Sequence, residues 1–289
     1  MSHPAPVAIV TGASRGAGRG IAVALGAHGC TVYVTGRSEK EGDASVAGTI
    51  YATADEVTKA GGKGIAVRCD HGDDAQVEAL FAQVEREQGR IDILVNNACA
   101  IHDALPAPGN FWEKPMVIGN MITVGVRSGF VASWLAAPMM VKQGRGLIVF
   151  TSAPGAVHYC FGPAYGAHKA GVDKMAADMA VDFKDAGVDV AAVSIWMGSL
   201  ATERLLEMIA AAPEKFGKLE NTLETPELTG HVIWALFNDP KLAEVNGKTV
   251  IGAEMAAHYG IKDKDGRMPP SVRDTHGCAP REQYPFKIK

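Results

Sequence analysis

The sequence has few cysteines, no run of basic residues and no long uniformly apolar run. Its 28 Lys and Arg are outnumbered by 32 Asp and Glu, so it lacks the electrostatic footprint of a protein that binds nucleic acid or acidic membranes. Five cysteines without a C-x-x-C pair argue against a disulfide framework or a zinc site. No stretch is expected to reach the length of a membrane span, and residues 1–6 carry no recognisable targeting signal. These absences favour a cytoplasmic protein with a small-molecule partner.

The histidines lack the pattern of a metal centre. No pair of them has metal-ligand spacing together with a third candidate side chain. We therefore interpret His71, His102, His158 and His168 as solvated or packed residues, and we predict no metal site.

Short β-branched runs alternate with longer helical patterns along the 289 residues. The predicted strands are residues 7–11, 31–35, 64–68, 91–95, 147–151, 188–195 and 248–251. Such alternation is typical of βαβ units, so we predict an α/β fold with a Rossmann-like, doubly wound, parallel seven-stranded sheet and helices on both faces. The length fits a single domain over residues 1–289, with a mostly irregular tail over about 259–289, which is rich in Pro, Gly and charge.

Two helices have clear boundaries in the sequence. Residues 73–88 keep helical spacing of apolar side chains after a plausible Asp73 cap, and residues 164–186 stop at Gly187. On the second helix, Asp173, Lys174, Asp178, Asp182, Lys184 and Asp185 are expected to form a solvated face. Residues 39–49 are expected to form an elongated connection.

The first motif is the glycine-rich stretch of residues 11–18, which follows an apolar strand and opens a helix. Backbone N–H groups of such a turn, with the positive end of the helix dipole, favour a pyrophosphate, and glycines let it approach closely. Glycine-rich turns also serve tight packing alone. The motif therefore indicates a nucleotide site only in combination with others.

The second motif carries the chemistry. Tyr165 and Lys169 are four residues apart on a predicted helix, so their side chains emerge from one face. An ammonium near the phenol stabilises the phenolate and lowers a pKa that is ordinarily about 10, which makes the tyrosine a usable acid or base. Ser152, at a predicted strand end, is expected to hydrogen-bond the substrate oxygen beside the phenol. A buried Tyr with a solvated Lys is the alternative for an isolated pair.

These motifs, in this order, resemble the short-chain dehydrogenase/reductase family over about residues 7–255. The resemblance implies a nicotinamide-dependent oxidoreductase in which Tyr165 exchanges a proton with the substrate oxygen. It also implies that Ser152 steadies that oxygen, while Lys169 lowers the phenol pKa and holds the nicotinamide ribose. Hydride transfer belongs to the cofactor. Asn97 lies in a stretch similar to the N-N-A-G strand end of the family, on the adenosine side.

Three positions depart from the family pattern. Cys99 stands where glycine is usual, and we interpret it as packing, with a reactive thiol as the alternative. Gly125 stands where many members carry an Asn that bends the helix and binds a water linking the Lys to solvent; a glycine leaves room for a bulge and a water. Met197 replaces the usual proline, while Thr202 keeps the place that contacts the nicotinamide carboxamide. The segment 199–223 resembles the mobile lid of the family.

The stretches 111–115, 124–127, 144–149 and 259–267 are similar to the dehydrogenase/reductase member 1 subgroup, which also has glycine at the Asn position. That resemblance implies an NADPH-dependent carbonyl reductase with broad activity toward steroids and xenobiotic carbonyls. The region 39–54 fits the subgroup poorly.

The end of the second predicted strand indicates the cofactor. An NAD site places an acidic side chain there, and none is present. Arg15 and Arg37 instead offer guanidinium groups for a 2′-phosphate, which predicts NADP(H); two solvated arginines are the alternative. Asp70 resembles the family residue that contacts the adenine amino group. The predicted cofactor-binding residues are Gly12, Ser14, Arg15, Gly16, Gly18, Arg37, Asp70, Asn97, Lys169 and Thr202.

The leading hypothesis is an NADP(H)-dependent enzyme that interconverts a ketone or aldehyde with an alcohol. One alternative is a nucleotide-binding sensor or scaffold with little turnover because Gly125 replaces Asn. Another is a methyltransferase, which the set of Ser152, Tyr165 and Lys169 disfavours. Loop aromatics and methionines are candidate pocket walls: Trp112, Tyr159, Phe161, Trp196, Met197 and Met208. The family resemblance also implies a homotetramer or homodimer.

Overall fold

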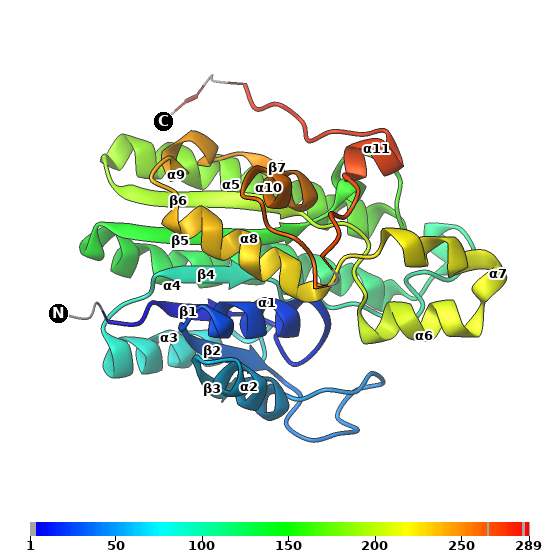
Figure 1. The fold of residues 1–289 in the computed structure, drawn as a ribbon, viewed down its shortest axis with the longest axis horizontal. Coiled ribbons are helices and arrows are strands. Elements are labelled where there is room, and N and C mark those ends of the chain that lie inside the picture. The colour runs from blue at the N-terminus through cyan, green and yellow to red at the C-terminus, as the bar shows by residue number, and fades with distance from the viewer. Residues whose placement is uncertain (1–3, 265, 285–286, 289) are drawn as a thin grey trace.

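A computed structural model describes residues 4–264, 266–284 and 287–288. Its centre is a seven-stranded sheet in the order β3-β2-β1-β4-β5-β6-β7, in which every neighbouring pair is parallel (Figure 1). The strands are β1 (Val7–Val10), β2 (Thr31–Gly36), β3 (Lys63–Arg68), β4 (Ile93–Asn96), β5 (Arg145–Ser152), β6 (Asp189–Trp196) and β7 (Thr249–Ile251). The predicted fold class and all seven predicted strands are confirmed.

Successive side chains of each strand serve two different hydrophobic cores. In β1, Ala8 and Val10 belong to one core and Val7 and Ile9 to the other. Because neighbouring residues of a strand point to opposite faces, a continuous apolar run is what a sheet covered on both sides requires. This explains why β1, β2 and β4 are buried at every residue rather than at alternate ones.

Helices cover both faces of the sheet (Figure 1). The helices α1 (Gly16–Ala27), α2 (Ile50–Lys59) and α8 (Pro226–Asn238) pack on one face, and α3 (Asp74–Gln88), α4 (Ser128–Gln143) and α5 (Pro163–Ala186) pack on the other. The remaining helical segments of the described chain are η1 (Phe111–Glu113), η2 (Met116–Gly119), η3 (Ile122–Arg127), η4 (Pro154–Ala156), α6 (Glu203–Ala211), α7 (Pro213–Phe216), η5 (Gly217–Thr222), α9 (Leu242–Val245), α10 (Gly252–His258) and α11 (Val272–His276).

The predicted helix boundaries have the expected local causes. The Asp73 carboxylate accepts hydrogen bonds from the amides of Ala75 and Gln76 and so caps α3, as predicted. Gly187 ends α5 in the left-handed conformation, at φ 65°, where a glycine has no steric penalty. Both helices therefore begin and end within one residue of their predicted limits.

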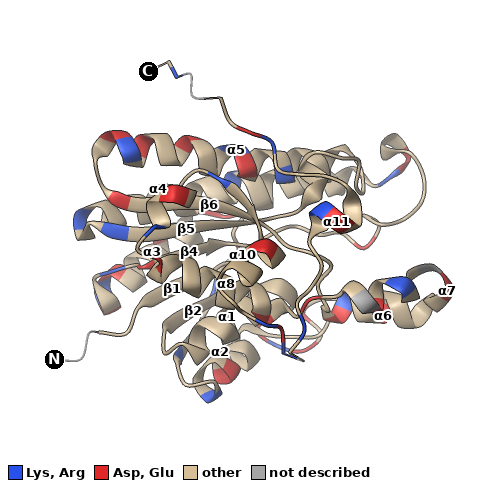
Figure 2. Cartoon of the chain, turned by 45° about the horizontal axis from the view of Figure 1, so that its top comes forward, with Lys and Arg blue, Asp and Glu red and all other residues tan. Residues whose placement is uncertain are grey.

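The predicted lid and tail both contain helices. The segment 199–223 holds α6, α7 and η5, and Figure 1 shows it projecting beyond the carboxyl ends of the strands. Residues 39–49 form a loop without helix or strand, as expected. In the described part of the tail beyond residue 259, α11 is the only helix. Figure 2 shows charges of both signs spread over the helices and loops.

One statement made from the sequence is wrong. The helical run Met116–Gln143 is long and apolar enough to cross a membrane by length and composition, with 39% of its most apolar window buried. Helices of protein cores pass the same test, and α4 packs on the sheet through Ala132, Ala136 and Met140. Its outer face exposes Phe130 and Trp134.

Candidate active site

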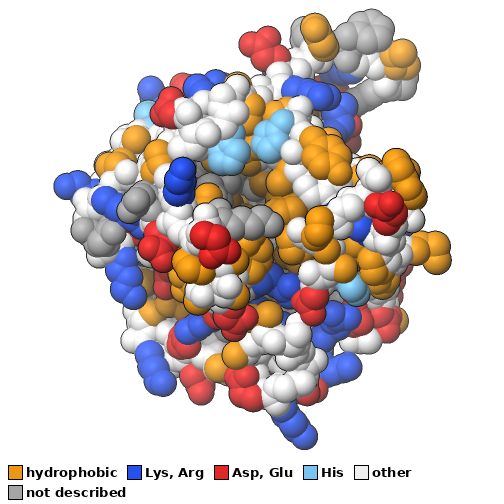
Figure 3. Space-filling model, turned by 90° about the vertical axis from the view of Figure 1, so that its right-hand side faces the viewer, with side chains coloured by type: hydrophobic (Ala, Val, Ile, Leu, Met, Phe, Trp, Pro, Cys, Tyr) orange, Lys and Arg blue, Asp and Glu red, His pale blue; other side chains and the backbone are white. Residues whose placement is uncertain are grey.

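A cavity of about 890 Å³ lies at the carboxyl ends of the strands, as expected for a doubly wound sheet. Figure 3 shows this end of the molecule, where hydrophobic side chains surround a hollow with basic groups inside it. All the residues predicted to bind the nucleotide line this cavity: Gly12, Ser14, Arg15, Gly16, Gly18, Arg37, Asp70, Asn97, Lys169 and Thr202. Tyr165 lines it as well.

The glycine turn is held tightly against the end of β4. Gly12 has φ 64°, and a Cβ there would lie 2.7 Å from the Cα of Ala98, so the turn requires glycine. The side-chain amide of Asn97 donates to the backbone carbonyls of Thr11 and Gly12 at 2.9 and 3.1 Å. The Thr11 hydroxyl accepts hydrogen bonds from the backbone N–H groups of Asn97 and Ala98. Asn97 thus shapes the turn as well as lining the cavity.

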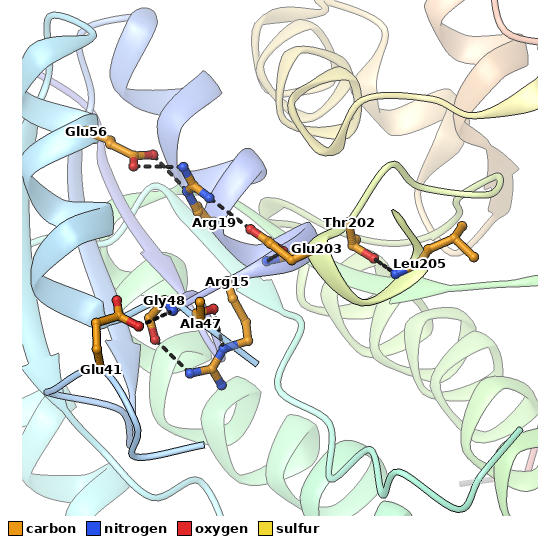
Figure 4. A network of polar contacts seen from close by, with 10 residues as sticks. Arg15, Arg19, Glu41, Ala47, Gly48, Glu56, Thr202, Glu203 and Leu205 are labelled. Atoms are coloured by element: carbon orange, nitrogen blue, oxygen red, sulfur yellow. Dashed lines mark hydrogen bonds and ion pairs between the residues drawn. The ribbon is translucent and has the colours of Figure 1, made fainter. Parts of the chain in front are cut away.

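Arg15 is engaged by the loop that follows β2 (Figure 4). Its guanidinium donates to the Ser38 hydroxyl at 2.8 Å and to the carbonyls of Ala47 and Gly48 at 3.1 and 2.7 Å. Burial lowers the pKa of Arg15, the nearby carboxylates of Glu203 and Glu41 oppose this shift, and the charges of Arg204 and Arg37 add to it. This end of the cavity therefore carries charges of both signs.

Arg37 is more available than Arg15. Its side chain is 69% exposed, and its nearest acidic group is the Asp70 carboxylate, at 3.8 Å. At that distance the pair is weak, because solvent screens it. Asp70 also accepts from the Gly72 amide at 2.9 Å, which fixes its carboxylate at the cavity wall.

Tyr165 and Lys169 meet at the same cavity wall. The Lys169 Nζ lies 5.6 Å from the centre of the Tyr165 ring and donates to the Thr151 carbonyl at 3.1 Å. Burial raises the pKa of Tyr165 and lowers that of Lys169. This direction is opposite to the predicted lowering of the phenol pKa by Lys169: burial is the main cause, and Cys160 and Cys99 raise the Tyr165 pKa further. The phenol is protonated at neutral pH.

Ser152 is placed differently from its prediction. It is fully buried, does not line the cavity, and donates to the Lys169 carbonyl at 3.3 Å. Neighbouring residues of a strand point to opposite sides, and at the end of β5 it is Thr151 that faces the cavity. The structure thus brings Tyr165 and Lys169 together and leaves the Ser152 hydroxyl behind them.

Asp173 is a correction to the predicted solvated face of α5. It is 8% exposed, and its carboxylate accepts from the Ser194 hydroxyl at 2.6 Å and from the Trp196 indole at 2.8 Å. Burial raises its pKa, while these hydrogen bonds and Lys169 oppose the shift. Asp173 lies one turn beyond Lys169 and ties α5 to β6. Its position in the sequence of α5 is that of an exposed residue, because the partners that bury it, Ser194 and Trp196, lie on β6.

Cys99 and Gly125, two of the positions that depart from the family pattern, both lie beside His168. The Cys99 sulfur lies 3.5 Å from His168 Nδ1, and a Cβ on Gly125 would lie 2.9 Å from His168 Nε2. The helical path breaks at Val124 and Gly125, as the predicted bulge requires, but the imidazole fills the space beside Gly125. Burial lowers the pKa of His168 to about 3 and raises that of Cys99, so both are neutral, and the packing interpretation of each is favoured.

The predicted pocket walls are only partly found. Met197 lines the cavity, as do Ile101, Val117 and Leu200, so part of the cavity wall is apolar. Trp196 does not, because it is fully buried in the core. The other predicted wall residues, Trp112, Tyr159, Phe161 and Met208, are also not among those that line the cavity.

Sequence reasoning missed two acidic residues at this end of the sheet. Glu203 begins α6 and reaches the N-terminus of α1, where it accepts from the Gly16 amide. Glu224 is 1% exposed and accepts from the Gly198 amide, while its second oxygen has no hydrogen-bond partner. In the sequence, the place of Glu203 directly after Thr202, at the start of a helix, was a signal for its contact. No sequence signal pointed to Glu224.

Glu224 makes stability depend on pH. Burial raises the pKa of Glu224 from 4.5 to about 7. Between these values the folded protein keeps a proton that the unfolded chain has released, so stability from this group falls as pH rises from 4.5 to about 7. We expect Glu224→Gln to remove this slope: between pH 4.5 and pH 8 the parent protein should lose about 3 kcal/mol of stability that the variant keeps.

Urea unfolding at both pH values measures this difference, with the exposed Glu220→Gln as the matched control. Parallel pH dependence in the parent protein and Glu224→Gln would contradict the assignment.

Comparison with known proteins places the chain in a family. Residues 6–208 match the family model described as short chain dehydrogenase. Dehydrogenase/reductase SDR family member 1 of Mus musculus is 42% identical over 272 residues, covering 90% of this chain and 84% of that protein. The Homo sapiens protein of the same name is 40% identical with the same coverage.

Solved structures show the same fold. A short chain dehydrogenase from Mycobacterium thermoresistibile superposes with a TM-score of 0.76 at 24% identity, covering 92% of this chain and 91% of that one. A 7α-hydroxysteroid dehydrogenase, solved with NADH and 7-oxo glycochenodeoxycholic acid, gives 0.71 at 26% identity, covering 85% and 92%. The chain is therefore a member of the short-chain dehydrogenase/reductase family and falls in its dehydrogenase/reductase member 1 subgroup.

Proposed function

We propose that the protein is an NADP(H)-dependent oxidoreductase that interconverts a ketone or aldehyde with an alcohol. The observation that carries this proposal is the meeting of Tyr165, Lys169 and the glycine turn around one cavity. A proton donor, a cation and a nucleotide-binding turn in one enclosure are the parts that carbonyl reduction needs. The related 7α-hydroxysteroid dehydrogenase, solved with NADH and an oxo-steroid, supports this reaction class.

The residues present fit a nicotinamide dinucleotide. The amide of Gly16 already binds a carboxylate, that of Glu203, so the start of α1 accepts an anion. Arg37 and Arg15 would hold the adenosine end, and Thr202 and Lys169 the nicotinamide end. When bound, the nicotinamide supplies or accepts the hydride.

The phenol of Tyr165 suits the reductive direction. Because burial raises its pKa, the phenol carries its proton at neutral pH and can donate it to the oxygen of a carbonyl that is being reduced. Lys169 stabilises the phenolate that this transfer leaves behind. The role of Ser152 in orienting the substrate oxygen stays a prediction, because its hydroxyl donates to the Lys169 carbonyl and the residue does not line the cavity.

The choice of NADP(H) rests on Arg37. An exposed guanidinium at the end of β2 can pair bidentately with a 2′-phosphate, which NADH lacks. We expect Arg37→Gln to weaken NADPH binding about tenfold, which is about 1.4 kcal/mol, and to leave NADH binding within about twofold. Isothermal titration of both nucleotides measures this preference.

Arg86→Gln is the matched control, since the Arg86 side chain is 70% exposed and lies on α3 away from the cavity. An equal loss of NADH and NADPH affinity in Arg37→Gln would assign Arg37 to general charge attraction. Tighter binding of NADH than of NADPH by the parent protein would overturn the NADP(H) assignment.

The apolar part of the cavity wall favours a bulky apolar carbonyl substrate. A screen of NADPH consumption over steroid ketones, aromatic aldehydes and quinones tests the activity. Tight nucleotide binding without turnover on any carbonyl would favour the alternative, a nucleotide-binding sensor or scaffold.

We propose a cytoplasmic homodimer or homotetramer joined through α4 and α5. Phe130 and Trp134 on the outer face of α4 expose 51% and 65% of their surface. A second copy of the chain would cover these rings.

A further inference from the structure

Glu203 joins the predicted lid to the glycine turn (Figure 4). One carboxylate oxygen accepts from the Gly16 amide at 3.0 Å, and the other pairs with Arg19 at 2.8 Å. Gly16 is the first residue of α1, and Glu203 is the first residue of α6. Residues 187 positions apart in the chain are thus connected at one point of the cavity wall.

A second carboxylate, that of Glu56, positions Arg19 for this contact. It lies on α1 one turn beyond Gly16, and its guanidinium forms two hydrogen bonds of 2.8 Å with the Glu56 carboxylate of α2. The Glu203 side chain is 29% exposed, so the pair is partly shielded from solvent. A carboxylate bound by a helix N-terminus and a fixed guanidinium occupies the kind of position that a phosphate oxygen prefers.

We propose that Glu203 is a displaceable latch: in the nucleotide-free protein its carboxylate lies at the phosphate site and holds α6 over the cavity, and the phosphates of the dinucleotide take its place. This inference rests on the proposed function, because it assumes that a dinucleotide binds here. Two anions cannot share the Gly16 amide without repulsion, so nucleotide binding and release of α6 are coupled.

The first test is direct binding. We expect Glu203→Gln, which keeps the side-chain shape and removes the charge, to lower the Kd for NADPH about five- to tenfold, because no competing anion has to be displaced. Glu207→Gln is the matched control, since it makes the same charge change on the exposed face one turn further along α6. It should leave the Kd within about twofold.

The second test needs no dinucleotide. Hydrogen exchange of residues 203–211 should be faster in Glu203→Gln than in the parent protein or Glu207→Gln, because the latch is absent. Inorganic pyrophosphate should accelerate exchange of the same residues in the parent protein and have no effect in Glu203→Gln.

Two outcomes would overturn the proposal: weaker NADPH binding by Glu203→Gln, which would make the carboxylate part of the bound-state scaffold, or identical exchange of residues 203–211 in all three proteins. Failure of the proposed function looks different. In that case the parent protein binds neither NADPH nor NADH, while pyrophosphate still accelerates exchange of α6.

Discussion

Tyr165→Phe is expected to lower kcat about 1000-fold while leaving the Kd for NADPH within about twofold. The substitution removes one hydroxyl and keeps the ring that packs against Gly155 and Phe161, so the cavity keeps its shape. The substitution removes the proposed proton donor from this point of the cavity wall. The buried Lys169 ammonium donates instead to the Thr151 carbonyl.

The measurement compares single-turnover rates with isothermal titration of the nucleotide. Tyr159→Phe is the matched control, because Tyr159 is 78% exposed and does not line the cavity. A kcat that falls less than about tenfold in Tyr165→Phe would remove Tyr165 from the proton transfer. A kcat of zero in the parent protein as well would favour the sensor.

The same residue predicts the pH dependence of reduction. Because burial raises the pKa of Tyr165, the protonated donor persists through neutral pH, and carbonyl reduction should lose rate only in the alkaline range.

The fold could be predicted because local sequence and tertiary structure agree in it. The central strand β1 is an apolar run that needs burial on both faces, and the glycine turn and Asp73 cap are local features. The meeting of Tyr165 with Lys169 was predictable for the same reason, since helical spacing alone puts both on one face.

The parts that could not be predicted depend on contacts between distant elements. Asp173 has the spacing of a surface residue and is buried only because β6 supplies Ser194 and Trp196 as donors. Whether Ser152 faces the cavity depends on how the last residues of β5 meet α5. Glu203 acquires its role from α1, far away in the chain.

The cluster at Gly125 is the clearest case of such a contact, and it predicts a large effect on stability. Gly125 has φ 151°, a conformation that residues with a side chain rarely adopt, and its amide donates to the Ser128 hydroxyl at 2.9 Å. A methyl group there would also press on the His168 ring at 2.9–3.2 Å. Backbone strain and overpacking each contribute about 1–3 kcal/mol, so Gly125→Ala should destabilise the protein by about 4 kcal/mol and lower its Tm by about 10 °C.

Gly119→Ala is the matched control, because a Cβ at Gly119 would meet open space. The double variant Gly125→Ala/His168→Ala separates the two causes. If the imidazole fills the space beside Gly125, removing the ring relieves the overpacking, and the double variant loses about 1–2 kcal/mol less than the sum of the single variants. Strictly additive losses would mean that backbone strain alone requires the glycine. Since His168 precedes Lys169 in the chain, coupling would also mean that the helix break and the proposed catalytic lysine are positioned by one packed unit.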